Sequence, residues 1–173
     1  AAGAQHTCAT RGAGELYCWG DNRYGQWGAG TRSYQQPDPL RVAVGRLYQD
    51  LSAGTRHSCA VAADGVVDCW GRNDSGQLGL GIFGEQHRPT PVSGISGVEL
   101  DSGYHHSCAL DSEGRIRCWG YNEQGQLGDA TAALAQPRPS DVVTTVRWTS
   151  IGLGTNHSCA ISEGGGLYCW GDN

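Results

Sequence analysis

The protein has 173 residues, 38% of them hydrophobic, a length that suits a single domain with a sizeable core. Its formal net charge of −5 argues against a partner recognised through a phosphate backbone, which normally meets a basic face. No apolar run approaches the ~20 residues that a membrane-spanning helix needs.

The first predicted element is a β-hairpin over residues 6–20, and its pattern returns at 57–71, 106–120 and 157–171. In the third copy the apolar positions share one parity, so they share one face of the strands; they are Cys108, Leu110, Ile116 and Cys118. The other copies carry Leu16, Val67 and Leu167 on that face. A glycine follows each first cysteine by six residues, where a tight turn needs positive φ: Gly14, Gly65, Gly114 and Gly165.

Between the hairpins the chain repeats a second set of features. An asparagine and a Gly-Gln-x-Gly motif are followed by a divergent loop and then by a Pro-x-Pro pair, interpreted as an extended edge segment. The three pairs, taken to lie at one phase, are Pro37/Pro39, Pro89/Pro91 and Pro137/Pro139. A further strand is predicted before a hairpin, as at 97–103 and 147–154. Helical periodicity is absent, so the sequence predicts an all-β protein.

The strongest signal is the repeat itself. Cys-Trp-Gly recurs at offsets of 51, 49 and 51 residues, and a period near ~50 is typical of propeller blades. We predict a single propeller segment over residues 1–173, in which 23–73, 74–122 and 123–173 are full repeats and 1–22 is the trailing hairpin of another.

The combined pattern, close to "G..H..AL...G.v..WG.N..GQLG", resembles the regulator-of-chromosome-condensation repeat family over essentially the whole chain. The resemblance implies a β-propeller of four-stranded blades, usually seven, of which this chain would supply about three and a half. The rest of the ring, or another copy, would then cover the open blade edges, and a chain without methionine is expected to be a processed product or a fragment. The cysteines depart from the nuclear members and are similar to those of secreted bacterial proteins and plant receptor ectodomains.

The eight cysteines are expected to pair within the hairpins. A hairpin centred on residue 113 places Cys108 opposite Cys118, at a Cα separation that a disulfide can span. The repeat then selects Cys8–Cys18, Cys59–Cys69, Cys108–Cys118 and Cys159–Cys169, each worth about 2 to 3 kcal/mol. The alternative interpretation is a zinc site. The His-x-Cys motif and the second cysteine of each hairpin supply only three ligands, whereas a structural zinc site requires four. We therefore expect no metal or cofactor, and a secreted or cell-surface location.

Other repeated residues are interpreted as structural. The histidines are assigned a hydrogen bond at the start of a strand, the tryptophans blade-to-blade packing and the asparagines turn chemistry. They are His6, His57, His106 and His157; Trp19, Trp70, Trp119 and Trp170; and Asn22, Asn73 and Asn122. Ser58, Ser107 and Ser158 each adjoin a histidine, but neighbours in a strand point to opposite faces, which excludes direct attack. No catalytic residue is expected. Asn73 and Asn156 lie in glycosylation sequons, and their modification stays open.

What differs between copies is the better guide to function. The loops after Gly-Gln-x-Gly differ completely, and Tyr34, Phe83 and His87 are the candidate binding residues on them. We expect a non-catalytic, disulfide-stapled extracellular module that binds a protein or another macromolecule, and no nucleic acid.

Arginine as the sole cation suggests a bacterial source. The alternative is a structural subunit of a cell-surface polymer; a secreted-enzyme inhibitor or an enzyme fits less well. Family precedents include a chromatin-bound exchange factor, a β-lactamase inhibitor and receptor ectodomains.

Overall fold

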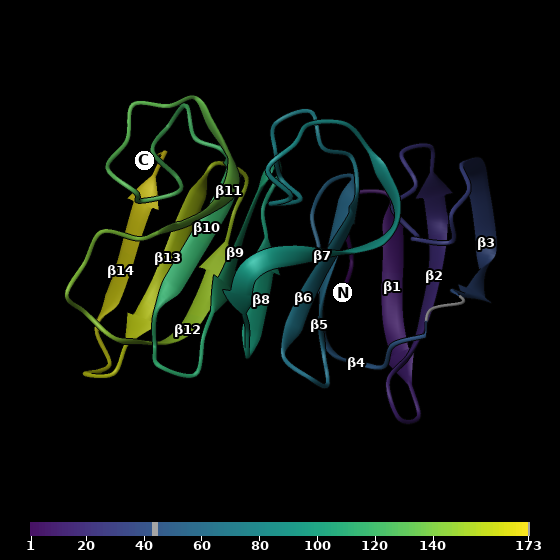
Figure 1. Ribbon diagram of the computed structural model, residues 1–173, viewed down its shortest axis with the longest axis horizontal. Coiled ribbons are helices and arrows are strands. Elements are labelled where there is room, and N and C mark those ends of the chain that lie inside the picture. Colours follow the sequence, from purple (N-terminus) through teal and green to yellow (C-terminus); the bar gives the residue numbers. More distant parts are fainter. Residues whose placement is uncertain (43–44, 173) are drawn as a thin grey trace.

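Fourteen strands form four antiparallel sheets in the computed structural model, which describes residues 1–42 and 45–172 (Figure 1). Within these residues there is no helix. Two sheets have four strands and two have three, and they stand side by side as successive blades. The predicted all-β propeller architecture of about three and a half blades is confirmed.

Each sheet is a meander, because its consecutive strands are joined by short turns or single loops. The first sheet contains β1 (His6–Arg11), β2 (Glu15–Asn22) and β3 (Ser33–Arg41); the second β4 (Tyr48–Ala53), β5 (His57–Ala62), β6 (Val66–Gly71) and β7 (Gln86–Ser96); the third β8 (Glu99–Ser102), β9 (His106–Leu110), β10 (Ile116–Tyr121) and β11 (Ala135–Asp141); the fourth β12 (Trp148–Leu153), β13 (His157–Ser162) and β14 (Leu167–Gly171). Strand β8 lies beside both β4 and β12, so these three are the inner strands, and β3, β7 and β11 are the outer ones.

The hairpins have the register that the sequence predicts. Cys108 pairs with Cys118 and Leu110 with Ile116 between β9 and β10, and the other three hairpins pair their cysteines in the same way. The turn glycines adopt positive φ, for example 81° at Gly65 and 74° at Gly114. A side chain at these positions would be strained, which explains why each copy has glycine there.

The repeat units and the sheets are out of phase. Residues 23–73 run from β3 of the first sheet to β6 of the second, so the repeat bounds describe the sequence period and remain a prediction. The expectation of one phase for the proline pairs is wrong. Gln36, Gln86 and Gln136 all face the glycine of Cys-Trp-Gly, and the residues after them are Pro37, His87 and Pro137. His87 therefore stands where the other copies have proline, and Pro89 matches Pro39 and Pro139.

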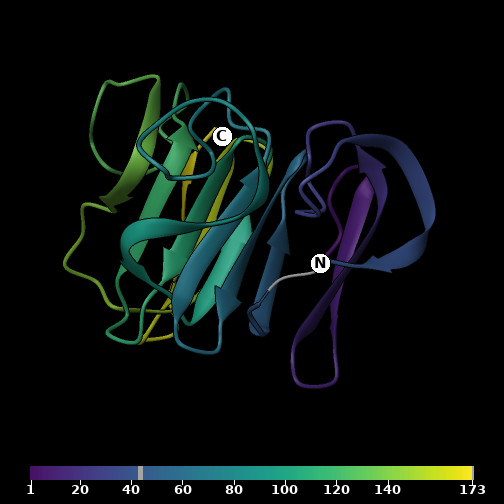
Figure 2. The same cartoon turned by 45° about the vertical axis from the view of Figure 1, so that its right-hand side comes forward.

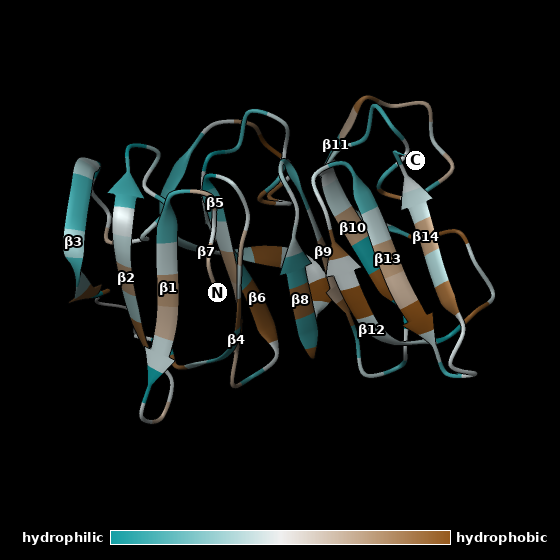
Figure 3. Ribbon diagram, turned by 180° about the vertical axis from the view of Figure 1, so that it is seen from behind, coloured by the Kyte–Doolittle hydropathy of each residue, from teal (hydrophilic) through white to brown (hydrophobic). Residues whose placement is uncertain are grey.

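The hydrophobic core lies between the sheets. In each of three clusters, the disulfide face of one sheet packs against the opposite face of the next. Between the first and second sheets, for example, the cluster contains Cys8, Leu16, Cys18, Trp27, Val42, Tyr48, Ala60, Ala62 and Trp70. Figure 3 shows hydrophobic bands recurring in the strands of successive sheets, whereas the outer strand β3 is mostly hydrophilic. Turning the molecule by 45° shows the sheets stacked face to face, so their contacts, and not any single sheet, form the core (Figure 2).

The disulfide face of the fourth sheet differs from the other three. Leu167, at the position of the buried Leu16, Val67 and Ile116, is 70% exposed. Cys169 is exposed as well, whereas the cysteines of the first three sheets are buried.

This difference predicts the order in which the disulfides are reduced. Thiol–disulfide exchange requires access to a sulfur atom, so Cys159–Cys169 is expected to react first under native conditions. The measurement is mild phosphine reduction of the folded protein, alkylation and peptide mass mapping. Equal labelling of all eight cysteines from the earliest time point would contradict the burial pattern.

Candidate functional site at the upper rim

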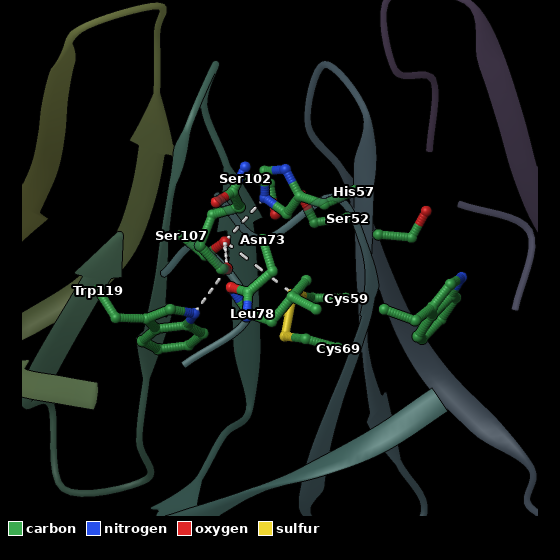
Figure 4. The surroundings of a disulfide bond; sticks show 12 residues. Ser52, His57, Cys59, Cys69, Asn73, Leu78, Ser102, Ser107 and Trp119 are labelled. Atoms are coloured by element: carbon green, nitrogen blue, oxygen red, sulfur yellow. Dashed lines mark hydrogen bonds between the residues drawn. A yellow bond between two sulfur atoms is a disulfide. The ribbon is translucent and has the colours of Figure 1, made fainter. Parts of the chain in front are cut away.

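Four disulfides join the predicted cysteine pairs, with Cα–Cα distances of 4.1 to 4.2 Å. Next to the buried ones, a chain of hydrogen bonds joins neighbouring sheets. His57 Nε2 lies 2.9 Å from Ser107 Oγ of the next sheet (Figure 4). Ser107 Oγ donates to the main-chain oxygen of Gln77 at 3.0 Å, and Trp119 Nε1 donates to the same oxygen at 2.9 Å. The other two interfaces repeat this arrangement with His6–Ser58–Gln26–Trp70 and His106–Ser158–Gln126–Trp170.

These contacts fix the protonation of the histidines. Because Ser107 gives its only proton to a carbonyl, it accepts from His57, so Nε2 of the ring carries the hydrogen. Burial lowers the pKa of His57 to about 3, and the pKa values of His6 and His106 to about 4. The rings are therefore neutral, and they lie against glycines: a Cβ on Gly54 would collide with Cε1 of His57.

The structure thus brings together histidines and serines that the sequence keeps apart. The serine or threonine that follows each histidine in its strand points away, but a serine about 50 residues later lies within hydrogen-bond distance. Such a pair could suggest a nucleophile and its base. Here the serine hydroxyl already donates to a carbonyl and both groups are buried, so the arrangement ties sheets together and offers no attack geometry. The repeat period is the signal that could have revealed it.

The asparagines order the loops at the same end of the strands. Asn73 Oδ1 accepts from Leu78 N at 3.0 Å, while its Nδ2 donates to the carbonyls of Ile82 and Gly84. Asn22 and Asn122 close their own loops in the same way. Asn73 is fully buried, and its amide is already used inside the loop. Asn156 is partly exposed.

The residues that change from copy to copy meet where β5 and β6, and their equivalents, reach the upper end of the sheets in Figure 1. The residue before each repeat histidine lies beside the residue after Cys-Trp-Gly, joined by a main-chain hydrogen bond. The pairs are Gln5/Asp21, Arg56/Arg72, His105/Tyr121 and Asn156/Asp172. A rigid repeated frame therefore presents a different side-chain pair in each blade. None of these residues was selected from the sequence as a candidate for partner binding, although substitution at a fixed spacing could have found them.

Three sheets contribute to one connected group at this end, which we call the rim row: Tyr24, Arg56, Arg72, His105 and Tyr121. The guanidinium of Arg56 lies 5.0 Å from the centre of the Tyr24 ring, and Arg56 NH1 donates to Tyr24 Oη at 3.2 Å. Arg72 lies 5.4 Å from the same ring, donates to His105 Nε2 at 3.4 Å and pairs with Asp74. The His105 ring in turn contacts Tyr121 edge to face at 6.4 Å. Burial, and next the charge of Arg72, lower the pKa of His105.

The binding residues predicted from the sequence lie in or next to the outer strands β3 and β7. Tyr34 is 85% exposed at the start of β3, and Phe83 is 58% exposed in the loop before β7. His87 is not at a loop tip; it lies in β7, where Arg32 Nε donates to its Nε2 at 3.2 Å. Beside Tyr34 there is a hollow of about 440 Å³ lined by Arg23, Tyr24, Arg32, Ser33 and Tyr34.

Two other properties of the described residues bear on function. Across residues 1–42 and 45–172, no cluster of three or more histidine, cysteine or acidic side chains is arranged to hold a metal ion. The same part of the chain contains no helix that is long and apolar enough to cross a membrane.

Comparison with known proteins identifies the repeat. The profile of the "Regulator of chromosome condensation (RCC1) repeat" matches residues 1–26, 48–77, 98–126 and 148–173, and a second profile of that name matches 64–110. Among curated proteins, human "Probable E3 ubiquitin-protein ligase HERC4" is 38% identical over 91 residues, which are 51% of this chain and 9% of HERC4. The "Ultraviolet-B receptor UVR8" of Arabidopsis thaliana is 36% identical over 95 residues, 54% of this chain and 22% of the receptor.

Solved structures agree on the fold. Human WBSCR16 superposes with a TM-score of 0.88 at 24% identity, over 99% of this chain and 46% of that one. Yeast RCC1 (Prp20), solved bound to Kap60, superposes with a TM-score of 0.81 at 26% identity, over 97% of this chain and 40% of that one. The receptor kinase CR4 ectodomain from Physcomitrella patens superposes with a TM-score of 0.62 at 28% identity, over 98% of this chain and 39% of that one. The chain therefore spans less than half of each of these proteins.

Proposed function

The chain belongs to the regulator of chromosome condensation (RCC1) repeat family, and from that membership we propose that it is a non-catalytic propeller module that binds a partner protein through its upper rim. The rim row is the observation that carries the proposal, because arginine and tyrosine dominate the energetically important positions of protein interfaces. Rigid strand ends also hold these side chains in place before binding, which reduces the entropy lost on association. One solved relative, yeast RCC1, was crystallised with a protein partner, Kap60.

We further propose that the module works outside the cytoplasm, in a secreted or cell-surface protein. Four disulfides, one in every sheet, support this location because thiols in reducing compartments stay free. The buried His–Ser pairs support a non-catalytic role, since each is committed to joining sheets. The ligase activity in the name of HERC4 is not part of this proposal, because the chain covers only 9% of HERC4.

Site-specific photo-crosslinking tests this proposal. A photoreactive phenylalanine would replace Tyr104, which is exposed beside the rim row, and, as the control, Thr144, which is exposed at the hairpin end. Both variants would be incubated with the extracellular fraction of the source cells. We expect a defined protein adduct from position 104 and none from 144. Adducts of equal yield from both positions, or from 144 alone, would refute the rim as the binding surface.

A second candidate function is assembly into a polymer through the open sheet faces. It is favoured by the exposed apolar residues on the disulfide face of the fourth sheet, Ile161 and Leu167. A face of this composition is buried at the other three interfaces of the same chain. Sedimentation velocity over a range of concentrations separates the two functions, because a polymer grows with concentration while a binding module keeps a fixed size.

A further inference from the structure

Arg56 is held by an aromatic ring and not by a carboxylate. Its guanidinium lies over Tyr24, and its NH1 donates to the Tyr24 hydroxyl. Within the described part of the chain, no acidic side chain forms an ion pair with it, whereas Arg23, Arg72 and Arg117 each bond an aspartate. A cation over a ring keeps its charge available to a second partner, because the ring satisfies its face and leaves other N–H groups free.

A second guanidinium shares the same ring. Arg72 approaches the centre of the Tyr24 ring to 5.4 Å, so two guanidinium groups contact one aromatic side chain. Asp74 pairs with only one of them. Two positive groups held at one ring repel each other, and an anion that contacts both would relieve that repulsion. The paired guanidinium groups therefore form a site that is complementary to a carboxylate.

Two further positively charged side chains lie near Tyr24. Arg23 and Arg32 line the 440 Å³ hollow together with the Tyr34 ring. They are paired with Asp21 and Glu85. Around Tyr24 there are thus four arginines against three carboxylates, Asp21, Asp74 and Glu85, in a protein whose formal net charge is −5. A fourth carboxylate, Glu123, accepts from Tyr121 at the other end of the rim row. A local positive surplus on an acidic protein attracts a matching acidic surface and orients it.

We propose that the rim row and this hollow bind an acidic segment of the partner protein, with one Asp or Glu carboxylate between Arg56 and Arg72. A second acidic side chain would lie at Arg23 and Arg32, and the Tyr24 and Tyr34 rings would pack against the segment between them. A nucleic acid or sulfated glycan fits less well, because Asp21 and Asp74 would meet its closely spaced negative charges. The inference rests on the proposed function, since it names the chemistry of the partner at that site.

Fluorescence anisotropy with defined probes tests the inference. The probes are fluorescein-labelled 12-residue peptides of one Gly/Ser/Tyr framework carrying four Glu, four Gln or four Lys, together with oligo-dT and heparin. We expect the Glu peptide alone to bind, with an affinity that falls on raising the salt concentration. The Arg56→Gln/Arg72→Gln variant should weaken binding by about tenfold or more, because two charge-assisted hydrogen bonds are lost. Arg115→Gln/Arg117→Gln, at the hairpin end, should change it less than about twofold.

Three results would overturn the inference: equal binding of the Glu and Gln peptides, unchanged binding by the Arg56→Gln/Arg72→Gln variant, or tighter binding of oligo-dT or heparin at the same residues. Thermal melting of each variant establishes that it is folded. The proposed function fails separately. A crosslinked partner at position 104 without acidic-peptide binding would preserve the function and reject the acidic segment. Peptide binding in the anisotropy assay with no adduct at position 104 would reject the proposed partner protein and leave only a site for acidic peptides.

Discussion

Lowering the pH from 7 to 4.5 is expected to destabilise the protein strongly, through the three buried histidines that join the sheets. Their pKa values are about 4, 3 and 4 in the folded state, for His6, His57 and His106, against an ordinary value of 6.5. Between pH 6.5 and 4 the unfolded chain therefore binds protons that the folded chain does not. Each proton costs about 1.4 kcal/mol of unfolding free energy per pH unit, so three give a slope of at most about 4 kcal/mol per unit.

The sign follows from neutral rings being favoured in the folded protein. The stabilisation is complete above pH 6.5 and is lost as the pH falls toward the folded pKa values. Two carboxyls act in the opposite direction, since burial raises the pKa values of Asp50 and Asp68 and makes them stabilising when protonated. As the pH falls they therefore offset part of the stability that the three histidines lose.

Urea unfolding at half-unit pH steps measures this effect, with His57→Gln as the matched variant. A glutamine amide can donate to Ser107 as the imidazole does but cannot be protonated, so the pH slope should fall by about a third. A stability that is flat from pH 7 to 4.5, or a slope unchanged in His57→Gln, would show that the histidines are not the groups responsible.

The second large effect is expected from Trp70→Ala. Trp70 is fully buried between the first and second sheets, and its Nε1 donates to the Gln26 carbonyl at 2.8 Å. Replacing a large buried aromatic side chain by alanine costs about 3 to 5 kcal/mol. That is a large part of the stability of an ordinary domain. Chemical denaturation at pH 7.5 measures the loss.

Trp19 provides the control at the same position of the repeat. It is only partly buried, and no hydrogen bond of its indole to another sheet occurs among the described residues. Trp19→Ala should therefore cost less than half as much as Trp70→Ala. Equal losses would mean that tryptophan stabilises each sheet internally, and would argue against packing between blades as its role.

The sequence predicted what lies within one hairpin. The register between β9 and β10 follows from the parity of Cys108, Leu110, Ile116 and Cys118, because strand pairing and alternation are local rules. The same rules could not predict the contact between His57 and Ser107, which forms only when sheets stack. The alternation of side chains along a strand correctly placed neighbouring His and Ser on opposite faces. It gave no information about the serine one repeat later, which belongs to the next sheet.

The proposed site lies near the binding residues that the sequence singled out, and it centres on other residues. Tyr34 and Phe83 were selected because loops that vary in sequence are common binding sites. The residue types in the rim row also vary between copies. They vary at a fixed spacing within the repeat, so these positions resemble ordinary structural positions of the repeat. Arg56 and Arg72 come together because β5 and β6 form a hairpin, and Tyr24 joins them from the preceding sheet. Such a site becomes visible only when the blades are placed side by side.

The most direct test of the central claim, that the upper rim binds the partner protein, is the affinity of the crosslinked partner for two double variants. We expect Arg56→Gln/Arg72→Gln to weaken binding by about tenfold or more, and Arg115→Gln/Arg117→Gln to leave it within about twofold. The two variants remove the same charge from opposite ends of the sheets, so nonspecific electrostatics would affect both alike. Equal losses, or a loss confined to the hairpin-end variant, would contradict the claim.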